Sequence, residues 1–147
     1  MASPEALRAA VAGLAEPLRH REVDCVIAAE ARGFLLGPAL ALELGAGFAL
    51  ARKPGKLPFD TVSVEYELEY GTDRLELHAD ALQPGAHVLV HDDLLATGGT
   101  AQALCRLVET LGAGVLACGF LVELGFLGGR RRLADHDVYS LITYEAE

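Results

Sequence analysis

The stretch from Val88 to Thr100 constrains the fold more than any other part of this chain. It begins with the apolar run Val88–Val90, which is typical of a buried strand. Asp92 and Asp93 stand where that strand should end, and a helical pattern from Ala101 to Leu111 follows shortly afterwards. A strand, a short loop and a helix start form a geometry that binds phosphate, because the free N–H groups of the first helical turn favour an anion.

The loop before this helix carries residue types suited to hold a phosphate, namely Ala96, Thr97, Gly98, Gly99 and Thr100. Glycines let the backbone approach a ligand closely, and threonines add hydroxyl donors. No Gly-Lys-Ser/Thr follows, so this is not a Walker loop. Two carboxylates just before the loop could accept hydrogen bonds from vicinal sugar hydroxyls, which describes a site for a ribose 5-phosphate. The competing interpretation is that the acids end a strand and the glycines turn the chain.

Composition narrows the classes of function. The 147 residues are expected to form a single domain, 1–147, and 52% apolar residues with 16 glycines suit a compact α/β protein. No apolar segment reaches the length of a membrane span and the first residues show no signal peptide, so we expect a cytoplasmic protein without a membrane partner. Cys25, Cys105 and Cys118 are expected to be free core thiols. The net charge of −9 argues against nucleic acid as a partner.

A second loop of the same kind lies near the N-terminus. Cys25–Ala29 is a continuous apolar run, as in a strand covered on both faces. Glu30, Ala31 and Arg32 follow it and lead into a helix predicted from Phe34 to Leu44. Arg32 offers a planar fork of donors suited to phosphate, although a lone arginine at a helix start is usually a solvated charge.

A cluster of cations follows the third predicted strand, Phe48–Ala51. Arg52, Lys53 and Lys56 lie within five residues, and Pro54-Gly55 between them predicts an ordered turn. In an acidic protein such a cluster favours an anionic ligand over a merely solvated basic loop.

The segment from Thr61 to Ala79 alternates between apolar and polar residues and predicts two antiparallel strands. The apolar runs 115–124 and 138–143 predict two further strands. Arg130 to Arg132 are interpreted as a helix surface or a subunit contact, and His91 as a strand-end histidine satisfied by backbone. Strands alternating with helices, each followed by a reactive loop, predict a parallel α/β sheet with ligands outside its carboxyl ends.

Three motifs carry a family resemblance. The string from Asp92 to Thr100 resembles the signature of the type I phosphoribosyltransferases, in particular of those that use adenine. Glu30-Ala31-Arg32-Gly33-Phe34 is similar to their pyrophosphate-binding loop, in which relatives often hold a non-proline cis peptide, and the segment 52–58 is similar to another of their motifs. The resemblance covers nearly the whole chain. It implies a parallel twisted sheet flanked by helices, Rossmann-like, with a β-hairpin lid at about 53–79.

The resemblance also implies a reaction, in which adenine and 5-phosphoribosyl 1-diphosphate give AMP and diphosphate, with Mg²⁺ bound through the substrate. Glu69 would accept or relay the proton of the purine, Asp92 and Asp93 would orient the ribose, and Leu94 would pack on the base. Homodimers are typical of the family. The 5-phosphate would be bound by Ala96, Thr97, Gly98, Gly99 and Thr100, and the diphosphate by Ala31, Arg32, Arg52, Lys53 and Lys56.

One departure from the family pattern affects the prediction of which base the chain uses. Relatives carry an N-terminal hood that grips adenine, and this sequence is expected to lack it, since it begins at the helix that follows the hood. Three explanations stay open: a naturally or artificially shortened enzyme, a phosphoribosyltransferase for another base, or a partner chain that supplies the cover. A separate alternative to adenine transfer is a non-catalytic sensor of phosphoribosyl diphosphate or nucleotides.

Overall fold

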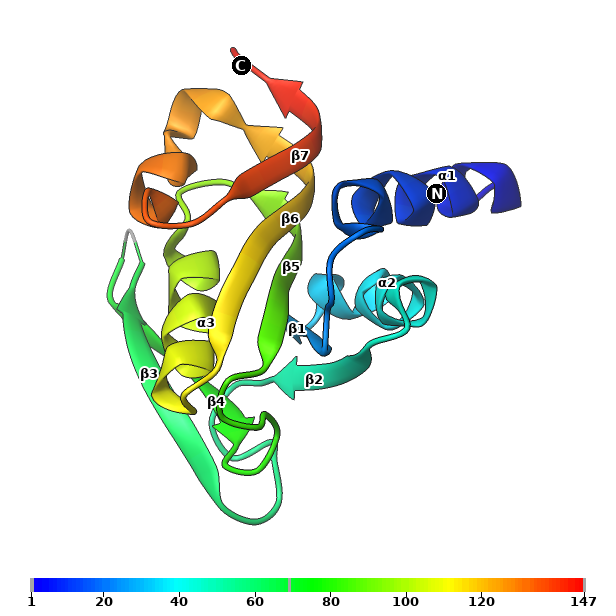
Figure 1. The fold of residues 1–147 in the computed structure, drawn as a ribbon. Helices are drawn as coiled ribbons and strands as arrows, with labels where there is room; N and C mark the ends of the chain where they lie inside the picture. The colour runs from blue at the N-terminus through cyan, green and yellow to red at the C-terminus, as the bar shows by residue number, and fades with distance from the viewer. Residues whose placement is uncertain (1, 69, 147) are drawn as a thin grey trace.

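A parallel sheet forms the centre of the computed structural model, which describes residues 2–68 and 70–146. Its five strands lie in the order β2-β1-β5-β6-β7, and every neighbouring pair is parallel (Figure 1). The strands are β1 (Cys25–Ala29), β2 (Gly47–Ala51), β5 (His87–Leu95), β6 (Gly114–Leu124) and β7 (Val138–Tyr144). The predicted parallel α/β sheet is therefore confirmed.

Three helices cover the two faces of this sheet. They are α1 (Pro4–Ala15), α2 (Gly37–Leu44) and α3 (Gly99–Thr110). Figure 1 shows α1 and α2 on one side of the sheet and α3 on the other. Four short 3₁₀ helices are described between the other elements: η1 (Glu16–Leu18), η2 (Arg32–Leu35), η3 (Gly125–Leu127) and η4 (Gly129–Leu133).

The central strand β5 is apolar along its first half because both of its faces are covered. Leu89 packs into a buried cluster with Leu14 of α1 and Leu40 of α2. Val90 points the other way, into the cluster that contains Leu104 of α3. The first half of β5 is thereby packed on both faces, and Leu95 at its carboxyl end is buried in the same cluster as Val90, directly before the loop that follows.

The predicted helix from Phe34 to Leu44 was wrong at its beginning. The segment starts with the 3₁₀ turn η2, and the α-helix begins only at Gly37, with Pro38 in its first turn. Proline has no N–H to donate to the carbonyl four residues earlier and its ring clashes there, so one continuous helix cannot run through Pro38. The predicted end at Leu44 is confirmed, and Gly45, which caps the helix, has a φ of 66°.

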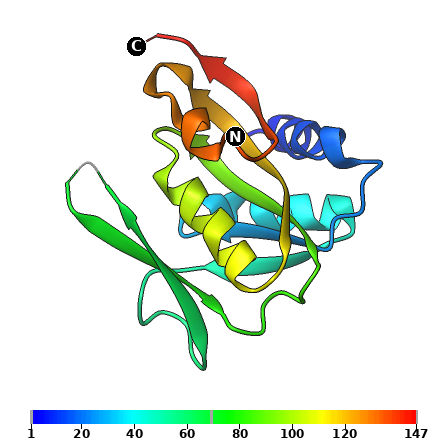
Figure 2. The same cartoon turned by 60° about the vertical axis from the view of Figure 1, so that its left-hand side comes forward.

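The predicted antiparallel hairpin is confirmed as β3 (Thr61–Glu67) and β4 (Thr72–His78), which form a separate two-stranded sheet beside α3 (Figures 1 and 2). Val64 and Tyr66 are buried, whereas Ser63, Glu65 and Glu67, which alternate with them, are exposed, as the alternation predicts. Leu68 continues the apolar alternation of the sequence but is 47% exposed, because β3 ends one residue before it.

All three cysteines are free and buried, as predicted. The Sγ atoms of Cys105 on α3 and Cys118 on β6 lie 3.6 Å apart. No helix in the described part of the chain has both the length and the apolar character needed to cross a membrane.

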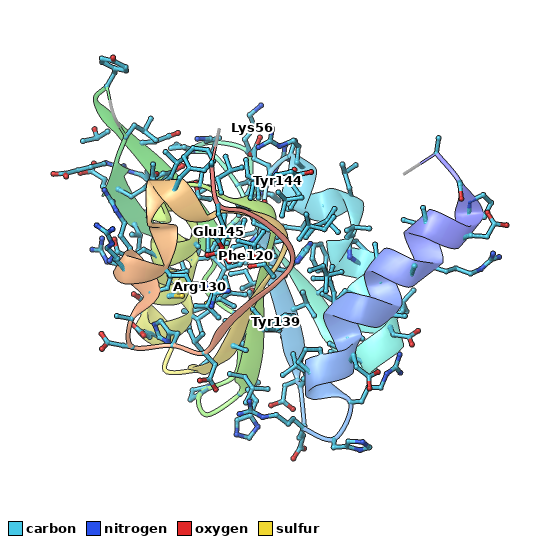
Figure 3. The ribbon with its side chains drawn as sticks, turned by 90° about the horizontal axis from the view of Figure 1, so that it is seen from above. Lys56, Phe120, Arg130, Tyr139, Tyr144 and Glu145 are labelled. Carbon is cyan, nitrogen blue, oxygen red and sulfur yellow. The ribbon has the colours of Figure 1, made fainter. Side chains whose placement is uncertain are left out.

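Replacing Tyr139 with phenylalanine is expected to lower the free energy of unfolding by about 1 kcal/mol. The Tyr139 hydroxyl donates to the carbonyl oxygen of Leu14 at 2.7 Å and so ties β7 to the end of α1, and the half-buried side chain packs against the cluster that contains Leu14 (Figure 3). Urea denaturation measures the loss. Tyr144→Phe is the matched control, because Tyr144 is 54% exposed on the same strand. Equal losses in the two variants would contradict a contribution from this hydrogen bond.

Candidate active site

The predicted phosphate loop joins the end of β5 to the start of α3. Gly98 has a φ of 85° and occupies the N-cap position, and its carbonyl oxygen accepts the N–H of Gln102 at 2.9 Å. The first N–H groups of α3 have no acceptor inside the helix and point out of its end. The strand continues to Leu95, so Asp92 and Asp93 belong to its last residues and project beside the loop.

Two adjoining clefts bring most of the predicted site residues together. Each has a volume of about 150 Å³, and Arg32, Asp92 and Thr100 line both of them. The first cleft is completed by Glu67, Leu68, Leu94, Leu95, Ala96, Thr97, Gly98, Gly99 and Ala101. The second is completed by Ala29, Glu30, Ala31, Lys53, Tyr66, Leu75 and Asp93. The phosphate loop and the loop after β1 therefore face one continuous recess at the carboxyl end of the sheet.

The two aspartates lie at the junction of these clefts. Asp93 Oδ2 is 3.1 Å from Arg32 Nε, and Asp92 Oδ1 accepts the N–H of Asp93 at 2.9 Å. Burial, together with the neighbouring carboxylate of Asp93, raises the pKa of Asp92 to about 7, although the N–H of Asp93 and the charge of Arg32 act in the opposite direction. Asp92 Oδ1 also packs closely on Gly33, where a Cβ atom would lie 3.1 Å from it.

The loop after β1 contains a cis peptide bond between Glu30 and Ala31, as its resemblance to the pyrophosphate loop implies. Sequence reasoning missed the role of Glu30 itself. Its Oε1 accepts the N–H of Lys53 at 2.7 Å and lies 3.3 Å from Arg52 Nε. The N–H of Lys53 and the charge of Arg52 lower the pKa of Glu30, which keeps it ionised. Glu30 thus joins the two predicted diphosphate loops. No local sequence pattern predicts its contacts with Arg52 and Lys53.

The three cations after β2 are placed differently from one another. Arg52 pairs with Glu30, and Lys53 Nζ forms an ion pair with Asp73 of β4 and lies 3.3 Å from the hydroxyl of Tyr66. Lys56 is exposed in the turn that follows. Among the described residues that line the two clefts, Lys53 is present, whereas Arg52 and Lys56 are not. Lys53 therefore links the lid hairpin to the recess.

The lid hairpin reaches over the phosphate loop. Glu67 and Leu68 line the first cleft, and Arg106 Nη1 of α3 donates to the carbonyl oxygen of Glu65 at 3.1 Å, which anchors the hairpin on the helix. The predicted catalytic residue Glu69 lies outside the described residues. Leu94, predicted to pack on the base, lines the same cleft as the phosphate loop.

His91 precedes the two aspartates and is buried, with Nδ1 3.0 Å from the carbonyl oxygen of Gly119 on the neighbouring strand. The expected satisfaction by backbone is confirmed for this nitrogen. Nε2 has no hydrogen-bond partner within the described residues. Burial lowers the pKa of His91, so the ring is neutral at pH 7 and adds no charge behind the aspartates.

Comparison with known proteins agrees with this geometry. Residues 3–145 match the family model described as the phosphoribosyl transferase domain. The adenine phosphoribosyltransferase of Rubrobacter xylanophilus is 63% identical over 139 residues, which cover 94% of this chain and 75% of that protein. The enzyme of the same name from Desulfitobacterium hafniense is 57% identical over 95% of this chain and 81% of its own length.

Solved structures give the same result. The adenine phosphoribosyltransferase of Thermoanaerobacter pseudethanolicus superposes with a TM-score of 0.93 at 53% identity, covering 95% of this chain and 81% of that one. The Saccharomyces cerevisiae enzyme, solved with an imino-altritol bisphosphate and adenine, has a TM-score of 0.88 at 40% identity over 95% of this chain and 81% of its own. The chain therefore belongs to the phosphoribosyltransferase family, in the group of the adenine phosphoribosyltransferases.

Proposed function

We propose that this chain performs purine salvage by transferring the phosphoribosyl group of 5-phosphoribosyl 1-diphosphate to adenine, which gives AMP and diphosphate. The observation that carries the proposal is the pair of adjoining clefts that share Arg32, Asp92 and Thr100. One cleft holds the helix N-terminus suited to a 5-phosphate, and the other holds cations suited to a leaving diphosphate. A ribose between them would lie against the two aspartates.

Each part of the donor has its residues in this proposal. The N–H groups and hydroxyls of the phosphate loop bind the 5-phosphate, and the carboxylates of Asp92 and Asp93 accept hydrogen bonds from the ribose hydroxyls. The diphosphate is bound by Ala31, Arg32, Arg52, Lys53 and Lys56. Because the bond at the anomeric carbon breaks ahead of attack, these cations neutralise the charge that develops on the leaving group.

The acceptor side of the site uses two residues. Leu94 packs on the adenine ring, which its place in the phosphate-loop cleft supports. Glu69 accepts or relays the proton that the purine loses when it attacks. The two clefts hold donor and acceptor in line, so the reaction gains from positioning as well as from charge.

Mg²⁺ fits the donor set of this site. Asp92 and Asp93 are hard oxygen donors at the recess, and no cluster of three or more His, Cys, Asp or Glu that could hold a metal occurs among the described residues. Such a site suits an ion that keeps its waters and takes most ligands from phosphate and hydroxyl oxygens. When bound, Mg²⁺ would neutralise diphosphate charge, while Asp92 and Asp93 would hold it through the ribose hydroxyls.

The test is incubation of the protein with 5-phosphoribosyl 1-diphosphate, Mg²⁺ and a panel of purines and pyrimidines, with nucleotide and diphosphate measured by chromatography. AMP from adenine alone is the expected result. Nucleotide from a different base would overturn the adenine assignment. Binding of the donor without any nucleotide would overturn the transferase and favour a sensor.

We also propose that the chain is one domain that works as a homodimer in the cytoplasm, with its small substrates as ligands and without nucleic-acid or membrane partners. Leu35, Leu42 and Phe59 are 68%, 83% and 92% exposed, so these apolar side chains are available to a subunit interface. The free cysteines support a reducing compartment. Light scattering after gel filtration would measure the mass, and a monomer would overturn the dimer.

A further inference from the structure

A backbone contact supports the phosphate loop from the side of η4. Gly129, the first residue of η4, packs so closely on the loop that a Cβ atom on Gly98 would lie 2.6 Å from its carbonyl oxygen. A Cβ atom on Gly129 would in turn collide with the carbonyl oxygen of Ala96. Gln102 Nε2 of α3 also donates to the carbonyl oxygen of Arg132 at 3.3 Å. The position of η4 therefore sets how the loop can lie.

An ion pair fixes η4 to the end of the sheet. Arg130 Nε donates to Glu123 Oε1 at 2.7 Å, and Arg130 Nη2 donates to Glu123 Oε2 at 2.8 Å. A third donor, Arg130 Nη1, reaches the carbonyl oxygen of Val138 on β7 at 2.7 Å. Figure 3 labels Arg130 on this side of the molecule. The guanidinium fork uses three of its N–H groups here, in a geometry that a lysine cannot reproduce.

Glu123 is placed to connect this ion pair with the phosphate loop. Its side chain is only 6% exposed, and Ser140 Oγ also donates to its carboxylate. In the register between β5 and β6 it pairs with Leu95, the residue directly before the loop. The hydrogen bonds from Arg130 and Ser140 lower the pKa of Glu123, so that it is ionised at neutral pH. A buried carboxylate paired in this way holds its partner in one orientation.

We propose that Arg130 is a positioning residue for the 5-phosphate, because its ion pair with Glu123 holds Gly129 against the phosphate loop. The inference rests on the proposed function, which assigns the 5-phosphate to that loop. Loss of the bidentate pair would free η4, and the loop N–H groups would no longer keep one geometry. Binding of the phosphate half of the donor should weaken, while the diphosphate half, which uses the loops after β1 and β2, should not.

The test compares Arg130→Lys with the unaltered protein by calorimetry, using ribose 5-phosphate and inorganic diphosphate as separate probes. We expect the Kd for ribose 5-phosphate to rise about tenfold, since small misplacement of positioning groups has effects of this size or larger. The Kd for diphosphate should change less than about twofold, and the donor KM should rise while the adenine KM does not. Arg131→Lys is the matched control, because Arg131 is an exposed neighbour with no ion pair within the described residues.

Glu123→Gln is the second variant and keeps the test informative if Arg130→Lys does not fold. Glutamine keeps an oxygen acceptor at this place but loses the charge, so an intermediate rise of a few-fold in the ribose 5-phosphate Kd is expected. Unchanged binding of ribose 5-phosphate in both folded variants, or an equal loss for both probes, would overturn the inference alone. No binding of ribose 5-phosphate by the unaltered protein would overturn the proposed function itself.

Discussion

Gly98→Ala is expected to lower kcat/KM for 5-phosphoribosyl 1-diphosphate by at least about a hundredfold, the largest effect of any single substitution proposed for this chain. Gly98 has a φ of 85°, which L side chains rarely adopt. The added Cβ would also lie 2.6, 3.2 and 3.3 Å from three backbone atoms of Gly129. Backbone cannot rotate away as a side chain can, so either the loop or η4 must move, and the phosphate-binding N–H groups move with it.

Initial-rate kinetics with varied donor measure this loss, and urea denaturation measures the accompanying drop in unfolding free energy, which we expect to be about 2 kcal/mol. Gly45→Ala is the matched control. Gly45 also has a positive φ, of 66°, at the end of α2, but a Cβ atom there would meet nothing within 4 Å. Its replacement should cost about 1 kcal/mol of stability and leave the kinetics unchanged. Comparable kinetic losses in the two variants would contradict the packing argument.

The phosphate loop could be predicted from sequence because its determinants are local. Glycines and threonines directly between an apolar strand and a helical pattern specify a strand, a tight loop and an open helix N-terminus without help from the rest of the chain. The parallel order of the sheet follows from the same alternation of strands and helices. The boundaries were less secure, as the 3₁₀ turn before Pro38 illustrates, because a helical apolar pattern does not reveal where hydrogen bonding must stop.

The pairings that tie the site together could not be predicted, because they join residues distant in sequence. Glu30 contacts Arg52 and the backbone of Lys53, and Lys53 reaches Asp73 on the lid hairpin. Nothing in the spacing of these residues distinguishes them from solvated charges. Arg130 was interpreted as part of a helix surface or subunit contact, and its ion pair with Glu123 emerges only when η4 folds back over the end of β6. Cations in a motif are therefore easier to recognise than the carboxylates that orient them.

The carboxylate of Asp92 leads to a prediction in which stability and activity change in opposite directions. Its pKa is raised from an ordinary 3.8 to about 7, first by burial and then by Asp93. Between these two pH values the folded state binds the proton more tightly than the unfolded state does, so the unfolding free energy falls as pH rises from about 4 to about 7. Above pH 7 the folded protein carries this cost in full.

Asp92→Asn should therefore be more stable than the unaltered protein at pH 8, by on the order of 2 kcal/mol, and gain little at pH 4. Asparagine does not titrate, and its side-chain oxygen can still accept the N–H of Asp93, as Asp92 Oδ1 does at 2.9 Å. Activity should fall, because a neutral amide accepts the ribose hydroxyl more weakly than a carboxylate. We expect a loss of about ten- to a hundredfold in kcat/KM for the donor.

Urea denaturation across pH 4–8 and initial-rate kinetics at pH 8 check both halves of this prediction. Asp135→Asn serves as the control, because Asp135 is exposed in the turn after η4 and lines neither cleft of the site. It should change neither quantity. If Asp92→Asn instead lowered the unfolding free energy at pH 8, the buried carboxylate would stabilise the protein without substrate, and the prediction would be wrong. The predicted gain instead means that the recess holds an ionised carboxylate at a cost in stability, which the binding of the ribose hydroxyls then offsets.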